Sequence, residues 1–278
     1  MVNNSFSKVV NFSLDKHILK PVDDSACRET YFLKSPEEAR EIYLHSKHQW
    51  VAEAYIDLAE YALDALVFDG KLLDYYPIMY PSQLIKTLDG GINANIALRH
   101  YSPALKEKAE YMLNKYIEGM NVMNGYIHME YFANPEHTKI VLGEVGIRLA
   151  GGRIPSDHEL SYGFDLFDAL IKIHTGVVPE LVYNQDRFVG DLLLPIKSGL
   201  IKEVSTMDEI MRFDGVIGGD VRVKQGQLVN PERASSSNSG YVIVEGNSAN
   251  EVIGRMANIH NNFKFIVDLE YVTNSFST

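Results

Sequence analysis

The chain has 278 residues, 46% hydrophobic and 23% charged, so it is long enough for one large or two small domains with real cores. Its 26 basic and 37 acidic residues leave a formal net charge of -11, which repels nucleic-acid backbones and anionic membrane surfaces. One cysteine excludes an internal disulfide, the first residues lack a secretory-signal pattern, and no apolar run is long enough to span a membrane. We therefore expect a cytoplasmic protein whose partners are small molecules rather than nucleic acid or membrane.

Short apolar runs separated by turn residues predict the strands of this chain. In chain order they are HILKP at 17–21, TYFLK at 30–34, WVAEAYI at 50–56, EYALDALVF at 60–68, GYIHMEYF at 125–132, KIVLGEV at 139–145, RFVGDLLLP at 187–195 and GYVIVE at 240–245. Short turns join more of these runs than helical crossovers do. We therefore expect a mixed α/β (α+β) fold with largely antiparallel sheets and flanking helices.

Four helices are indicated by their start signals. A serine followed three residues later by Glu is typical of a helix N-cap. This pattern predicts caps at Ser35 with Glu38, Ser156 with Glu159, and Ser248 with Glu251. These caps place helices near 36–47, 157–174 and 249–262. The remaining helix should begin with Ser102 as its cap and Pro103 in its first turn, and end at Gly119.

Two turn-forming segments indicate where the chain divides. The Asp69-Gly70 pair favours a tight turn, and the Pro195–Gly199 segment precedes a run of short strands and a capped helix. We expect three units, at 1–70, 71–195 and 196–278, the last being a small C-terminal domain.

The most informative segment is GYIHMEYFANPEHTKIVLGEVGIRLAGGR, which contains two predicted strands joined by the turn ANPEHT. A turn centred near His137 sets Glu130 opposite Glu144. Two carboxylates side by side repel each other, and Mg²⁺ bound by these carboxylates and by nucleotide phosphates would relieve the repulsion. Arg148 follows on the same face, where its guanidinium can hold a carboxylate or a phosphoryl group.

The same spacing also fits a solvated sheet face with no ligand. His128 shares a face with Glu130, and its position fits either a supporting role at the site or an ordinary hydrogen-bonded histidine of the sheet. Gly151 and Gly152 allow backbone amides to approach an anion closely. The spacing of these residues leaves both interpretations open.

Several motifs in sequence order resemble the ATP-grasp superfamily. The run EVGIRLAGGRI, preceded by HME, resembles the metal-binding core of these enzymes, where a glutamate precedes E-x-N-x-R and a glycine pair. HILKP resembles the strand that ends in a phosphate-binding lysine, and EAYI resembles the hinge that contacts adenine. The tail DGVIGGDVRVKQGQ with GYVIVEGNSANEVIGRM resembles, more loosely, the small C-terminal domain of amino-acid ligases and carbamoyl-phosphate-synthase-like ligases.

This resemblance implies an ATP-grasp fold and an ATP-dependent carboxylate-amine ligase that forms an amide or peptide bond through an acyl phosphate. It implies ATP and Mg²⁺ (or Mn²⁺) as cofactors, and a small-molecule carboxylate and amine, both amino acids, as substrates. The implied metal ligands are Glu130 and Glu144, and the implied catalytic residues are Glu144 and Arg148. The residues implied to bind ATP are Lys20, Glu53, Ala54, Tyr55, Ile56 and Glu60, and those implied to bind substrate are His128, Arg148, Gly151 and Gly152.

Three features depart from the family pattern. Gly146 stands where the family has a metal-binding asparagine, and the loop VDDSACRET after Lys20 contains no glycine. Family members also carry an N-terminal region before this point. The departures favour, as an alternative, a non-catalytic or regulatory nucleotide-binding subunit that needs a partner chain for that region.

Cys27 and the pair His45 and His48 are two further groups of reactive side chains. Acidic neighbours of Cys27 raise rather than lower a thiol pKa, which disfavours a nucleophile. His45 and His48 have helical spacing and could share a metal, but a solvated helix face is the better explanation.

Overall fold

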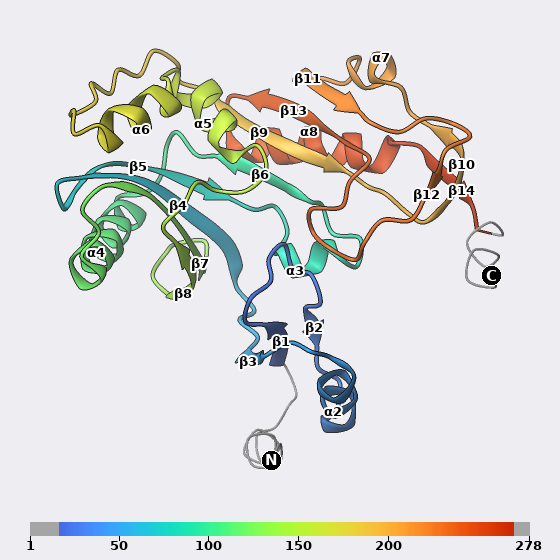
Figure 1. The fold of residues 1–278 in the computed structure, drawn as a ribbon. Helices are drawn as coiled ribbons and strands as arrows, with labels where there is room; N and C mark the ends of the chain where they lie inside the picture. The colour runs from blue at the N-terminus through green and yellow to red at the C-terminus, as the bar shows by residue number, and fades with distance from the viewer. Residues whose placement is uncertain (1–16, 270–278) are drawn as a thin grey trace.

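The computed structural model describes residues 17–269 and is built around one eight-stranded sheet (Figure 1). Its strand order is β11-β13-β9-β6-β5-β4-β7-β8, and every pairing in it is antiparallel. The predicted α+β fold with largely antiparallel sheets is therefore confirmed. The strands are β4 (Ala59–Phe68), β5 (Lys71–Met79), β6 (Ala94–Ala97), β7 (Gly125–Ala133), β8 (Ile140–Gly146), β9 (Phe188–Leu194), β11 (Val216–Val221) and β13 (Gly240–Gly246).

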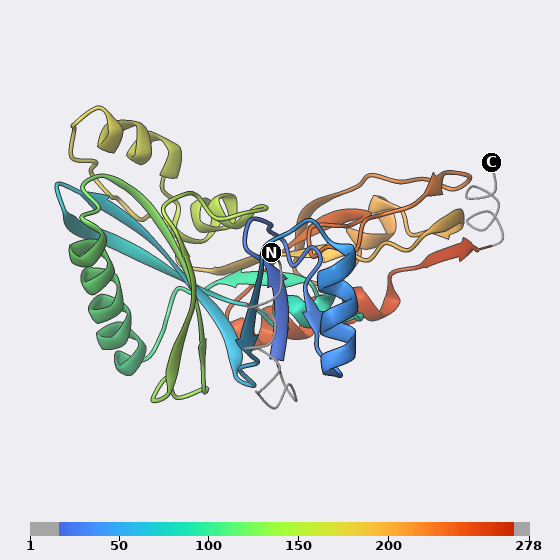
Figure 2. The same ribbon diagram turned by 60° about the horizontal axis from the view of Figure 1, so that its bottom comes forward.

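Two three-stranded sheets flank the large one. The first has the order β2-β1-β3 and carries helix α2 (Pro36–His45); Figure 2 shows this unit standing beside the large sheet. The second has the order β12-β10-β14. Their strands are β1 (His17–Pro21), β2 (Tyr31–Phe32), β3 (Trp50–Ala54), β10 (Gly199–Val204), β12 (Leu228–Val229) and β14 (Phe265–Asp268).

Helices cover both faces of the large sheet. Helix α4 (Pro103–Met120) lies on one face, and α5 (Ile154–Tyr162) and α6 (Leu166–His174) lie on the other (Figure 1). Helix α8 (Ala249–Asn262) packs against β6, β9 and β13. Two short helices, α3 (Leu84–Thr87) and α7 (Met207–Ile210), are the other helices within residues 17–269. Within residues 17–269, no helix has the length and apolarity needed to cross a bilayer.

The period-two alternation of β4 explains how its two faces differ. Leu63, Ala65 and Val67 are fully buried against α4 in one hydrophobic cluster. Ala62 and Leu66 point to the opposite face, where they join the clusters formed with α5 and α6. Because β4 lies inside the sheet and is covered on both sides, its sequence reads as a nearly continuous apolar run.

Three of the four predicted helix starts are confirmed. Ser35, Ser102 and Ser248 are the N-caps of α2, α4 and α8, and each side chain accepts a hydrogen bond from a first-turn backbone amide. The predicted end of α4 at Gly119 is one residue short, because the helix continues to Met120 and Asn121 forms a left-handed C-cap.

The predicted cap at Ser156 and the single helix 157–174 are wrong. The segment forms two helices, and α5 begins earlier, with Arg153 at its N-cap and no side-chain capping bond. Proline near the start of α5 suits the first helical turn, where its missing amide hydrogen is not needed. Gly163 then ends α5 in a left-handed conformation, and the Asp165 side chain caps α6.

The large sheet runs across both expected domain boundaries. The Asp69-Gly70 turn has positive φ at both residues, 49° and 70°, and connects β4 to β5 within the same sheet. On the other side of residue 195, β13 pairs with β9 along its full length. The units 1–70, 71–195 and 196–278 stay predictions about sequence organisation, and no break in the sheet separates them.

Gly190 of β9 provides a test of the packing between the central strands. A Cβ atom there would overlap the backbone carbonyl oxygen of Asn95 on β6. We expect Gly190→Ala to lower the free energy of unfolding by about 1–3 kcal/mol, measured by urea denaturation. The matched control is Gly218→Ala, whose Cβ would make only ordinary contact with Ile243 at 3.6 Å. Equal stabilities of the two variants would contradict the close approach.

Candidate functional site

A cavity of about 500 Å³ lies where the first small sheet meets the β7–β8 hairpin and helix α3. It is lined by nine residues that the sequence predicted as site residues, drawn from four separate segments of the chain. They are Lys20, Glu53, Ala54, Tyr55, Ile56, Glu60, Glu130, Glu144 and Arg148. Three other predicted residues are not part of the lining: His128 is buried behind it, and Gly151 and Gly152 are exposed outside it.

The register of β7 and β8 places the two predicted metal ligands opposite each other. Glu130 and Glu144 are cross-strand partners, as expected from the turn near His137. The register shifts directly beside this pair, so Gly143 bulges out of the ladder. A Cβ on Gly143 would lie 3.1 Å from the Glu130 carbonyl oxygen, which explains the need for a small residue there.

Lys20 supplies positive charge to this carboxylate pair from the other sheet. Its Nζ lies 2.9 Å from Glu53 Oε2 and 3.9 Å from Glu144 Oε2. Glu53 is on β3, which pairs with β1, so the lysine connects the hinge segment to the β7–β8 hairpin. The arrangement places a compact cation beside the carboxylates of the cavity.

The donor set of the cavity fits a hard divalent cation that completes its shell with nucleotide oxygens. Among residues 17–269, no group of three or more His, Cys, Asp or Glu side chains has the arrangement of a complete metal site. Mg²⁺ is commonly held by one or two carboxylates plus substrate phosphates, and Glu130 with Glu144 provides that share.

At Gly146, an added Cβ would lie 3.1 Å from Arg148 Cγ, so the arginine stem occupies space that a larger residue would need.

His128 lies between two carboxylates behind the cavity. Its Nδ1 is 2.6 Å from Asp64 Oδ1, and its Nε2 is 3.2 Å from Glu130 Oε1. Burial alone would lower the pKa of His128, but the hydrogen bonds to Asp64 and Glu130 outweigh it and raise the pKa from 6.5 to about 9. The structure thus places His128 where it can support Glu130, and not on the cavity surface where a bound substrate would lie.

Gln83 organises the hinge and was missed by the sequence analysis. Its Nε2 donates to the backbone oxygens of Ile56 and Leu58, at 2.8 and 2.6 Å, and its Oε1 accepts from the Tyr55 hydroxyl at 2.6 Å. These bonds fix the hinge backbone in one conformation at the cavity wall. No local pattern distinguishes Gln83 in the sequence, because its partners lie more than twenty residues earlier.

Glu60 is buried at the base of the cavity. Its Oε2 accepts a hydrogen bond of 2.7 Å from the backbone amide of Leu84, the first residue of α3. Burial, together with the nearby charge of Glu130, raises the pKa of Glu60 from 4.5 to about 8. The carboxyl group therefore binds a proton at neutral pH when no cation is near.

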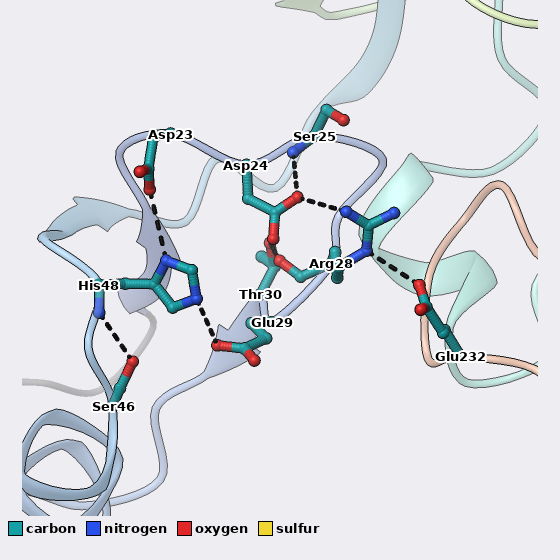
Figure 3. Close-up of polar contacts among 9 residues, drawn as sticks. All are labelled: Asp23, Asp24, Ser25, Arg28, Glu29, Thr30, Ser46, His48 and Glu232. Atoms are coloured by element: carbon teal, nitrogen blue, oxygen red, sulfur yellow. Dashed lines mark hydrogen bonds and ion pairs between the residues drawn. The ribbon is translucent and has the colours of Figure 1, made fainter.

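The loop 22–30, called the lid loop here, covers one side of the cavity and is held by side chains from distant segments (Figure 3). The Arg28 guanidinium contacts Asp24 Oδ1 at 2.9 Å and Glu232 Oε2 at 3.1 Å. The Ser235 backbone amide donates to the Ala26 carbonyl oxygen at 2.8 Å. The loop has no glycine, yet three of its residues have positive φ: Ala26, Cys27 and Glu29.

His48 holds the other side of the lid loop, which corrects its expected place on a helix. Helix α2 ends at His45, and the His48 ring lies between Asp23 and Glu29, at 3.4 and 3.5 Å (Figure 3).

Cys27 has its pKa raised to about 12, first by burial and then by Glu60 and Glu130. The expected direction is confirmed, but the cause lies in the cavity and not in the acidic residues of the loop.

Together, an eight-stranded antiparallel sheet, a small three-stranded sheet beside it and the cavity between them define the ATP-grasp fold. Residues 192–268 match the family model of the L-amino acid ligase C-terminal domain 2. The L-arginine-specific L-amino acid ligase of Bacillus subtilis is 24% identical over 229 residues, which cover 79% of this chain and 55% of that protein. The chain thus spans about half the length of this curated relative.

Solved structures show the same fold. The L-amino acid ligase of Bacillus licheniformis has 17% sequence identity and a TM-score of 0.70, covering 94% of this chain and 67% of that one. Carboxyaminoimidazole ribonucleotide synthase of Aspergillus clavatus, complexed with ATP, has 14% identity and a TM-score of 0.65, covering 93% and 65%. The chain therefore has the ATP-grasp fold and is similar to L-amino acid ligases over most of its length.

The raised pKa of Glu60 predicts a pH dependence of stability in the absence of nucleotide and metal. Between pH 4.5 and 8 the folded state keeps the Glu60 proton that the unfolded state has lost, so unfolding becomes easier as pH rises and the effect levels off above pH 8. Glu60→Gln removes this contribution and retains an acceptor for Leu84. Urea denaturation should therefore show the variant gaining stability relative to the wild type from pH 5 to 8, and a constant difference would contradict the shift.

The contacts of the lid loop predict that its mobility depends on Glu232. Glu232→Ala removes one partner of Arg28, and exposed ion pairs contribute about 0–1 kcal/mol, so amide exchange in residues 22–30 should rise by up to about fivefold. Hydrogen-deuterium exchange with mass spectrometry measures this. Glu203→Ala, which breaks the surface pair with Lys264, is the control and should leave the lid loop unchanged. Equal exchange in both variants would mean that Glu232 does not restrain the loop.

Proposed function

We propose that this chain provides the nucleotide- and metal-binding part of an ATP-dependent carboxylate-amine ligase that forms an amide or peptide bond. The observation that carries the proposal is the convergence of Lys20, Glu130, Glu144 and Arg148 on one cavity that the hinge residues 53–56 also line. A solvated sheet face does not explain why a lysine from another sheet and an arginine after β8 both line the space beside the carboxylate pair.

The proposed reaction has two steps. A substrate carboxylate oxygen attacks the γ-phosphorus of ATP, which breaks the bond to the bridging oxygen and releases ADP. An amine nitrogen then attacks the acyl carbon, phosphate leaves, and the nitrogen loses a proton. Positioning and charge stabilisation supply most of the catalysis in reactions of this kind.

Each residue of the cavity has a role that its chemistry supports. Glu130 and Glu144 hold the divalent cation, Mg²⁺ or Mn²⁺, which when bound neutralises phosphate charge. Lys20 contacts phosphate oxygens, because its neighbours Glu53 and Glu144 are exposed enough to be displaced by an anion. Arg148 binds the carboxylate that becomes the acyl phosphate, since its planar guanidinium matches both groups.

The hinge residues 53–56 and Glu60 seat the nucleoside. Backbone groups of a strand offer both donors and acceptors to an adenine edge, and Gln83 keeps this strand fixed. Glu60 accepts ribose hydroxyl groups from the base of the cavity. We infer amino acids as the substrate class, because the curated relative from Bacillus subtilis and the solved structure from Bacillus licheniformis are both named L-amino acid ligases.

A non-catalytic nucleotide-binding subunit is the second candidate. Gly146 favours it, because glycine has no side-chain oxygen to offer as a ligand and leaves the carboxylate pair as the protein's share of a metal site. Turnover separates the two functions: ADP release with a panel of amino acids and amines supports the ligase. Nucleotide binding without ADP release, with or without an added partner protein, supports the subunit.

Glu144→Gln tests the ligase directly. The side chain is 63% exposed, so its loss should leave the fold intact, while the charge needed at the cation disappears. We expect ADP release to fall by at least about a hundredfold, the upper range for weakened metal ligation. Glu107→Gln on the exposed face of α4 is the matched control and should retain full activity. Normal ADP release by Glu144→Gln would count against the assignment of Glu144.

A further inference from the structure

A continuous chain of buried side chains leads from helix α5 to the cavity. His158 Nε2 lies 2.9 Å from Asp64 Oδ2, Asp64 Oδ1 lies 2.6 Å from His128 Nδ1, and His128 Nε2 lies 3.2 Å from Glu130 Oε1. The side chains of Asp64 and His158 are 0% exposed, and that of His128 is 5% exposed. Glu130, at the end of the chain, lines the cavity.

The register of the large sheet produces this arrangement. Asp64 of β4 is the cross-strand partner of His128 of β7, and Glu130 follows two residues later on the same face. The neighbouring residues on that face, Ala62 and Leu66, belong to the apolar core. A carboxylate is costly in such surroundings unless it is hydrogen-bonded, so the presence of Asp64 requires both histidines as partners.

Both ring nitrogens of His128 are engaged, so the ring cannot rotate without losing a contact. Asp64 fixes the ring at Nδ1, and the ring in turn holds Oε1 of Glu130. Without this contact the Glu130 side chain would be free to sample other rotamers at the cavity wall. The contact is to one oxygen, which leaves the second oxygen of Glu130 for a ligand.

We propose that Asp64 and His128 are positioning residues that orient Glu130 for binding a divalent cation. This inference rests on the proposed function, since it assigns a cation to Glu130. Groups that hydrogen-bond a metal ligand fix its direction, and their loss commonly weakens metal affinity by about 10–100-fold. His128 acts through Glu130 and does not touch the nucleotide.

Two substitutions at His128 separate positioning from simple structural support. His128→Asn keeps an amide nitrogen near the place of Nδ1, where it can still donate to Asp64, but it is too short to reach Glu130. His128→Gln keeps a nitrogen near the place of Nε2, where it can still contact Glu130, but it abandons Asp64. Positioning and structural support therefore predict opposite orders of damage for the two variants.

The experiment measures Mn²⁺ binding by electron paramagnetic resonance of free Mn²⁺, with a non-hydrolysable ATP analogue present, alongside metal-free thermal unfolding. We expect His128→Asn to weaken Mn²⁺ binding by about 10–100-fold while melting close to the wild type. His128→Gln should melt lower but lose less Mn²⁺ affinity. His137→Asn is the matched control: a buried histidine of the same hairpin with positive φ, which Asn tolerates, and no contact with Glu130.

Two results would overturn the inference: unchanged Mn²⁺ affinity in His128→Asn, or losses of affinity that follow melting temperature across the two variants. If His128→Gln is too unstable to purify, the Mn²⁺ affinity of His128→Asn still decides between the two outcomes, and a His128→Asn variant that is itself too unstable to purify would contradict the expected stability. Wild-type protein that binds no Mn²⁺ with the analogue would overturn both the inference and the proposed cation site. Wild-type protein that binds Mn²⁺ but releases no ADP would overturn only the ligase and leave the positioning role standing.

Discussion

Repulsion between two carboxylates is the constraint on which the rest of the site depends. Glu130 and Glu144 are held opposite each other by the β7–β8 register, and this placement is disfavoured unless positive charge compensates it. The protein supplies that charge from two directions, Lys20 on the cavity side and His128 on the core side. The small sheet that carries Lys20 is thereby tied to the hairpin, and the cavity forms between them.

The two compensating contacts differ in strength because their surroundings differ. The Lys20–Glu144 pair is partly exposed, so water and salt screen it. The contact of His128 with Glu130 lies in the interior, where the local dielectric is low and its other partner Asp64 is completely buried. The Lys20–Glu144 contact can therefore adjust, while the His128–Glu130 contact is rigid.

The sequence predicts the parts of this site that depend on local patterns. Alternation within GYIHMEYF and KIVLGEV, with a short turn between them, determines which residues share a face and therefore which carboxylates meet. Strand β5 was missed, since Pro77 interrupts an otherwise apolar run and weakens its strand signal. The predicted cap at Ser156 was wrong. The pair Ser156 and Glu159 has the spacing of a cap, but Pro155 lies in the first turn of α5 and Gly163 ends this helix.

Contacts between distant segments are beyond such local patterns. Arg28 and Glu232 are separated by 204 positions, and nothing near either residue indicates the other. Gln83 likewise has no signal of its own, because its role comes from carbonyl groups that the fold brings to it. Asp64 lies between Leu63 and Ala65 in the buried part of its strand, and its two histidine partners explain why a carboxylate is retained there.

The glycine-free lid loop illustrates how tertiary contacts substitute for a local preference. Positive φ costs a non-glycine residue roughly 1–3 kcal/mol, and Ala26, Cys27 and Glu29 all adopt it. A loop with this strain keeps its shape only if the surrounding structure holds it. Contacts from His48 on one side and from residues 232–235 on the other provide that support. The conformation of the lid loop therefore depends on the C-terminal part of the chain, which links the segment matched by the ligase family model to the cavity formed by the rest.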